Sequence, residues 1–231
     1  TSAFIPYASK LHRTCIQTCG FNLMCGIAGI YSHKPVAAEL YDSIIHLQHR
    51  GQDAAGIMTY DDRMHKEKGM GLAKEVFNET NMELLTGNIG ISHNRYPTHG
   101  GFSHGEVQPF WTSVPYGIAL AHNGNLTNYP DLAEEITHKD SRYLNTNSDS
   151  EILLNILASE IAKEQKHRIN ETDIFKAVKK LHQRVKGAYA AIGMIPGYGI
   201  FGFRDPHGIR PLIIGEKTTA KGTSYMVASE S

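Results

Sequence analysis

The residue in this sequence best suited to chemistry is Cys25, which follows the first methionine, Met24, and precedes Gly26 and Gly29. If Met24 is removed, the thiol and a free α-amino group belong to the same residue. An α-amino group has a reference pKa of about 8, so it can accept the thiol proton near neutral pH. The alternative is that Cys25 is a small buried apolar residue in an edge strand. The preceding methionine and the two glycines favour the nucleophile.

Two further segments carry side chains suited to a polar substrate. Asn123-Gly124 follows an apolar run and is either a hairpin turn or a pair of donors for an oxyanion, a side-chain amide and an unobstructed backbone N–H. Ser148 and Glu151 fit the capping box of a helix start, and Asp149 adds a first-turn carboxylate that suits the helix dipole. Both segments therefore have structural explanations beside the functional ones.

Two arginines stand where an apolar run or a helix ends. Arg95 follows the run 89–93, and its guanidinium is a rigid fork that fits a carboxylate bidentately. Arg50 ends the first predicted helix, where its residue type alone indicates a solvated helix-end charge. From the residues alone, Arg95 is therefore the stronger candidate for binding an acidic group.

Strands and helices that would position these residues follow from the apolar pattern. Three segments with helical spacing lie at 40–47, 152–161 and 174–185, the last ending before Gly187. Because strands come in blocks and helices are grouped, the order predicts an α+β fold with mostly antiparallel sheets. The runs that predict strands are 25–31, 55–60, 89–93, 117–122, 188–195, 199–204, 211–215 and 225–228.

The bulk composition narrows the classes of partner. The 23 basic and 23 acidic residues balance, so the charge excess expected of a nucleic-acid or anionic-membrane binder is missing. We find no run of about twenty apolar residues, so no membrane span is expected. The three cysteines, Cys15, Cys19 and Cys25, are too few and too clustered for a disulfide framework, which favours a cytoplasmic location. A small-molecule partner is therefore expected.

Two weaker patterns do not support a site. Gly197, Gly199 and Gly202 spell G-x-G-x-x-G, but no helix begins after them, so the sequence predicts a hairpin rather than a dinucleotide site. The 13 histidines are scattered without metal-ligand spacing, so no metal site is expected.

From Met24 to Ser231 the chain resembles class II glutamine amidotransferases, which are N-terminal nucleophile (Ntn) hydrolases. The four motifs that carry the resemblance are Gln48 to Gly56, His93 to Gly100, Ala121 to Asn128 and Asn147 to Glu151. The resemblance implies a four-layer αββα sandwich over residues 25–231 and a glutaminase that needs no cofactor. It implies these roles: Cys25 as nucleophile, Asn123 and Gly124 as oxyanion donors, Arg95, Thr98 and Asp149 as glutamine-binding residues, and Arg50 as a brace for the Cys25 end.

Gln52-Asp53-Ala54 is similar to the branch that transfers ammonia to phosphoribosyl pyrophosphate in purine synthesis, whereas His99 is like the aminosugar-forming branch. The first branch implies a C-terminal phosphoribosyltransferase domain, a Mg²⁺ site in that domain, and a homo-oligomer as the full-length enzyme. Asp61-Asp62 lacks the following small hydroxyl residues of the phosphoribosyl signature, so we expect that domain to lie outside this sequence. The alternatives are a glutamine:fructose-6-phosphate amidotransferase or a non-catalytic regulatory module of the same fold.

Residues 1–23 form a separate segment, with Lys10, His12 and Arg13 but no acidic residue. A basic, acid-poor leader is typical of a transit or pro-segment, which would imply an organelle location. The alternative, which the start at Met24 favours, is upstream sequence that is not part of the mature domain.

We predict that a polypeptide beginning at Thr1 releases no glutamate from glutamine, whereas one beginning at Met24 does so after trimming to Cys25. With Met24 attached, the nitrogen of Cys25 is an amide and cannot accept the thiol proton, and only a few per cent of a thiol with a pKa of about 8.5 is ionised at pH 7. Both forms should be expressed, their N-termini sequenced and glutamate release measured. Equal rates from an untrimmed long form would contradict the terminal-amine mechanism.

Overall fold

A computed structural model describes residues 24–96 and 104–231. The strands are β1 (Gly26–Tyr31), β2 (Ala54–Tyr60), β3 (Met64–Met70), β4 (Ile89–Arg95), β5 (Phe110–Thr112), β6 (Ile118–Leu126), β7 (Gly187–Ile195), β8 (Gly199–Arg204), β9 (Ile213–Thr219) and β10 (Gly222–Ala228). The helices are α1 (Ala37–His46), α2 (Ala73–Val76), α3 (Glu79–Glu83), α4 (Tyr129–Asp140), α5 (Asp149–Ala162) and α6 (Glu171–Arg184), with short 3-10 helices η1 (Leu47–Arg50) and η2 (His104–Glu106).

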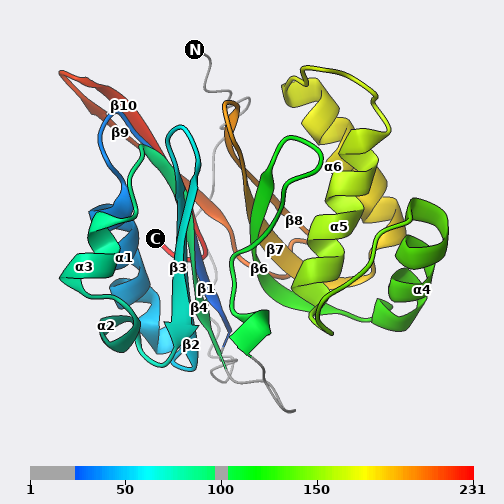
Figure 1. Ribbon diagram of the computed structural model, residues 1–231, viewed down its shortest axis with the longest axis horizontal. Coiled ribbons are helices and arrows are strands. Elements are labelled where there is room, and N and C mark those ends of the chain that lie inside the picture. Colours follow the sequence, from blue (N-terminus) through cyan, green and yellow to red (C-terminus); the bar gives the residue numbers. More distant parts are fainter. Residues whose placement is uncertain (1–23, 97–103) are drawn as a thin grey trace.

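The strands form two sheets that face each other, and helices cover both outer faces (Figure 1). One sheet has the order β3-β2-β4-β1-β10-β9 and the other β5-β6-β7-β8. Neighbouring strands pair antiparallel throughout both sheets. The predicted α+β, four-layer αββα architecture of Ntn hydrolases is confirmed.

Each outer layer has its own apolar core. Leu40 and Ile44 of α1 are fully buried with Ile57 of β2, so α1 covers the six-stranded sheet. On the other side, α5 is buried along nearly its whole length because α4, α6 and the four-stranded sheet surround it. Arg184 of α6 donates to Glu160 of α5 at 2.6 Å and to Asp140 of α4 at 2.8 Å, which ties the three helices together.

The two sheets meet through a third core that contains Ile27 of β1, Ile91 of β4 and Ile192 of β7. Gly29 of β1 allows their close approach. A Cβ added to Gly29 would lie 2.7 Å from Cγ2 of Ile192 and 3.3 Å from Cγ2 of Ile91. The absence of a side chain at Gly29 therefore sets the distance between β1 and the opposite sheet.

The structure departs from the sequence-based expectations at several elements. The strand β3 was missed because its residues, MHKEKGM, contain no apolar run, and β9 begins at Ile213, two residues later than predicted. The helix α4 was also missed. The expected hairpin from Gly197 to Gly202 is confirmed as the β7–β8 connection.

We predict that Gly29→Ala lowers the free energy of unfolding by about 1–3 kcal/mol, because the added methyl group forces Ile192 or the backbone to move. Denaturant unfolding measures the change. Gly215→Ala in β9 is the matched control, since a Cβ there meets no atom within 4 Å. Equal unfolding free energies for the two variants would contradict the close-approach argument.

Candidate active site

Cys25 immediately precedes β1, the strand that pairs with β4 on one side and β10 on the other. Because side chains alternate along a strand, Cys25 shares the inner face of the sheet with Ile27 and Gly29. Gly26 pairs with Asn94, so the next position outward brings Cys25 opposite Arg95. The sheet register thus places the thiol beside the predicted carboxylate-binding guanidinium.

Asn123 approaches from the opposite sheet. It shares the inner face of β6 with Ala119 and Ala121, which belong to the core between the sheets. Its side chain is buried, and its Nδ2 has no hydrogen-bond partner among the described residues. A buried amide donor left without a partner is costly, which suits an atom that binds a ligand oxygen.

Asn123 and Gly124 lie within β6, so the hairpin-turn alternative is wrong. Gly124 has φ of +150°, and a Cβ there would lie 2.1 Å from the Ala188 carbonyl oxygen of β7. Close strand pairing therefore already requires a glycine. Its residue type by itself does not identify an oxyanion donor.

Asp149 is the first residue of α5, and β6 holds it in place. Its Oδ2 accepts from the Leu126 N–H at 3.1 Å. Its Oδ1 lies 3.8 Å from Nδ1 of His122, and that nitrogen lies 2.9 Å from Oγ of Ser150. His122 and Ser150, which sequence reasoning did not single out, thus fix the start of α5 against β6.

The capping box is not formed, although Ser148 is the N-cap. The Ser148 hydroxyl accepts from the Ser150 N–H at 3.3 Å rather than from the Glu151 N–H that a capping box uses. The Glu151 carboxylate instead accepts from the backbone N–H groups of Asn145 at 2.9 Å and Thr146 at 2.8 Å. Glu151 therefore closes the loop before the helix, because that loop folds back over the first turn.

Opposing influences act on the Cys25 thiol. Burial raises its pKa most; the Tyr96 backbone N–H and the Arg95 charge lower it, and the Asp149 carboxylate raises it. The thiol thus needs a base to ionise near neutral pH. Arg95 and Asp149 both lie close enough to Cys25 to influence its charge, which brings these three predicted residues together.

Arg95 has an acidic neighbour that the sequence did not reveal. Its NH1 lies 3.5 Å from Oε2 of Glu106, which belongs to η2, and both side chains are mostly buried. Burial lowers the pKa of Arg95, and Glu106 opposes that shift. Glu106 was missed because it shares no element or spacing with the four motifs.

Arg50 belongs to η1 and is buried, so its interpretation as a solvated charge is wrong. Its Nε donates to the Cys25 carbonyl oxygen at 3.2 Å, and its NH1 donates to Oε1 of Glu230 at 2.5 Å. The structure thus places Arg50 directly against Cys25. Thr98 and His99 lie outside the described residues.

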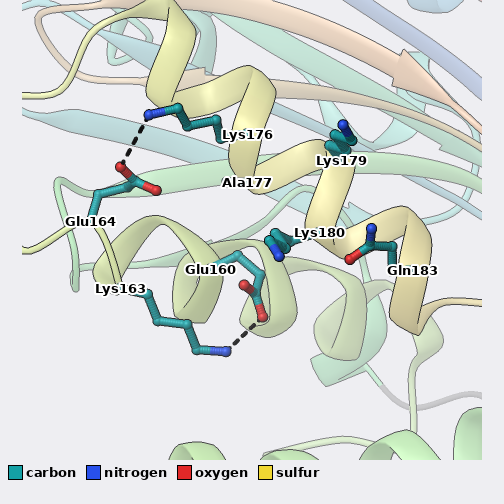
Figure 2. A pocket seen from close by; sticks show the side chains of 8 residues that line it. All are labelled: Glu160, Lys163, Glu164, Lys176, Ala177, Lys179, Lys180 and Gln183. Atoms are coloured by element: carbon teal, nitrogen blue, oxygen red, sulfur yellow. Dashed lines mark hydrogen bonds and ion pairs between the residues drawn. The ribbon is translucent and has the colours of Figure 1, made fainter.

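Two other features lie away from Cys25. A hollow of about 400 Å³ lies between α5 and α6 on the outer helical layer, on the far side of the four-stranded sheet (Figure 2). Its lining is Glu160, Lys163, Glu164, Lys176, Ala177, Lys179, Lys180 and Gln183.

At the β2–β3 turn, the carboxylates of Asp61 and Asp62 cluster with His65. This turn follows one end of β2, and Arg95 pairs with the other end of that strand. The Asp61 carboxylate accepts from the Arg63 N–H and the Thr86 hydroxyl. These hydrogen bonds stabilise the turn, which is a structural reason for an aspartate at this position.

Comparisons with known proteins identify the family of this chain. Residues 93–231 match the family model of the glutamine amidotransferase domain. Over 90% of its length the chain is 53% identical to an amidophosphoribosyltransferase of Pseudomonas aeruginosa and 49% identical to one of Saccharomyces cerevisiae. The chain spans 42% of the length of each of these two relatives.

Solved structures give the same result. The PRPP amidotransferase of B. subtilis, in complex with ADP and GMP, superposes with a TM-score of 0.72 at 31% identity, covering 89% of this chain and 42% of that one. A structure described as the allosteric regulatory enzyme of purine biosynthesis gives 0.75 at 32%, with the same coverage. Among the described residues no helix is long and apolar enough to cross a membrane. The chain belongs to the class II glutamine amidotransferase domain family and is similar in sequence to a part of the amidophosphoribosyltransferases.

Proposed function

We propose that this chain hydrolyses glutamine to glutamate and ammonia, with Cys25 as the nucleophile. The observation that carries the proposal is that Cys25, Arg95 and Asp149 lie close enough to influence one another's charge. A thiol between a cation and a carboxylate matches an α-amino acid, whose carboxylate and ammonium groups need opposite charges. The buried, unpartnered amide of Asn123 adds a donor for the reacting oxygen.

The reaction follows from these groups once Met24 is removed. The α-amino group of Cys25 takes the thiol proton, and the thiolate attacks the side-chain amide carbon of glutamine. Nδ2 of Asn123 and the N–H of Gly124 stabilise the resulting oxyanion. The C–N bond then breaks, and ammonia leaves with the proton held by the amine. Water hydrolyses the remaining thioester, which releases glutamate and regenerates the thiol.

Substrate binding is assigned to the charged residues around the thiol. Arg95 binds the α-carboxylate, the resemblance adds Thr98 as a further glutamine-binding residue, and Asp149 binds the α-ammonium group. The partly buried guanidinium of Arg95 already has Glu106 at 3.5 Å, so a substrate carboxylate shares it with a resident acid. Glu106 weakens the attraction of Arg95 for any anion. An amino acid regains binding energy through its ammonium group at Asp149, whereas an anion without an ammonium group does not.

For the natural protein as a whole, we propose delivery of the ammonia to phosphoribosyl pyrophosphate, which yields phosphoribosylamine, the first step of purine synthesis. The support is that relatives at 53% and 49% identity are amidophosphoribosyltransferases. These identities favour this acceptor over fructose 6-phosphate. The acceptor site, its Mg²⁺ and a homo-oligomeric assembly belong to this proposal, and the cytoplasm remains the predicted location.

We expect Cys25→Ala to abolish glutamate release while leaving the unfolding midpoint nearly unchanged, because the substitution is small and lies at a strand start. Glutamate release is measured enzymatically. Mass spectrometry of acid-quenched wild-type protein should also show a glutamyl adduct on the peptide that begins at Cys25. Substantial turnover in the folded variant would remove the thiol from the mechanism.

Asp149→Asn should raise both the KM for glutamine and the rate of Cys25 alkylation. The KM for glutamine should rise at least tenfold, because losing an interaction with a charged group costs about 1.5–3 kcal/mol. Alkylation of Cys25 by iodoacetamide at fixed pH should become faster, because removing the Asp149 charge lowers the thiol pKa. The Asn side chain can still accept from the Leu126 N–H, so a large loss of stability with normal kinetics would indicate a purely structural role.

A further inference from the structure

The segment after β10 runs beside the start of β1. The Ser229 N–H donates to the Ile27 carbonyl at 3.0 Å, and Oγ of Ser229 accepts from the Ile27 N–H at 3.2 Å. Ser229 is fully buried. Residue 230 is therefore held close to the nucleophile strand, although more than 200 residues separate Ser229 from Ile27 along the chain.

Glu230 uses both carboxylate oxygens in this position. Its Oε1 accepts from NH1 of Arg50 at 2.5 Å, and its Oε2 lies 2.9 Å from Nε2 of His49. The two partners differ in exposure, since the Arg50 side chain is 7% exposed and that of His49 is 60% exposed. The contact with Arg50 is therefore the one protected from water.

Arg50 depends on this carboxylate. Among the described residues, Glu230 is the one acid within ion-pair distance of its guanidinium. A buried cation that loses its counter-charge is strongly destabilised, so without Glu230 the guanidinium would move toward water. Such a movement would also break the hydrogen bond from its Nε to the Cys25 carbonyl oxygen.

We propose that Glu230 is a positioning residue for the nucleophile: it fixes Arg50, and Arg50 fixes the carbonyl group of Cys25. The inference rests on the proposed role of Cys25. Arg95 pairs with Glu106, and Asp149 contacts Leu126 and His122, whereas the Glu230 carboxylate pairs with Arg50 and His49. Glu230 therefore affects the rate of attack by the thiol rather than the binding of the substrate.

The test compares Glu230→Ala with His49→Gln in the full-length protein. For Glu230→Ala the kcat of glutamate release should fall at least tenfold while the KM for glutamine stays within twofold. His49→Gln removes the exposed contact with Glu230, together with a local contact of the His49 ring to the His46 carbonyl oxygen, and should leave kcat within twofold, since exposed ion pairs contribute little. Glu230→Gln keeps an oxygen that can accept from Arg50 and should recover part of the lost kcat.

A second measurement needs no glutamine. Hydrogen exchange of the peptide covering residues 25–31 should be at least tenfold faster in Glu230→Ala than in His49→Gln, whereas exchange in α5 should be equal. If Glu230→Ala does not fold, Glu230→Gln takes its place in both measurements.

The positioning role would be overturned if the Glu230 variants had the wild-type kcat and the wild-type exchange rate of residues 25–31. It would also be overturned if His49→Gln lost as much kcat as Glu230→Ala. If the wild-type protein releases no glutamate, the proposed function fails. The exchange comparison then decides the positioning role by itself.

Discussion

The close approach of the two sheets at Gly29 and Ile192 is the constraint on which the rest of the structure depends. It holds β1 in the interior, paired on both edges and packed on both faces. A strand held in this way cannot slide without losing two ladders of hydrogen bonds and its core contacts. Cys25, at the start of that strand, therefore has a fixed position relative to the opposite sheet that carries Asn123.

Charged side chains lie around Cys25, at the ends of the strands and outside the apolar core. Each of the two arginines beside Cys25 has its own acid, Glu106 for Arg95 and Glu230 for Arg50. Partly buried cations need such partners, because desolvation otherwise costs several kcal/mol per ion. The pairing allows two positive groups to lie near one thiol without repelling each other out of place.

Much of the fold was predictable because its core strands are apolar, α1 and α6 are amphipathic, and α5 is apolar over most of its length. The apolar pattern predicted an α+β fold with mostly antiparallel sheets, whereas the four-layer arrangement and the adjacency of Cys25, Arg95 and Asp149 were expected through the resemblance. What failed depends on tertiary contacts. The residue type of Arg50 indicates a solvated charge, but the side chain is buried in η1. The strand β3 is polar because it lies at a sheet edge. Glu230 contacts Arg50 because β10 pairs with β1, which no local sequence pattern indicates.

Among the described residues, His93 and His122 are buried histidines, and their burial makes the stability of the fold depend on pH. Burial lowers the pKa of His93 to about 3 and keeps that of His122 below its usual range, so both rings stay neutral in the folded protein. In the unfolded chain a histidine takes up a proton below about pH 6.5. Stability contributed by the neutral rings is present above that pH and is lost as the medium becomes more acidic. Acidification below about pH 6.5 would thus lower the free energy of unfolding before it protonated these side chains in the folded protein.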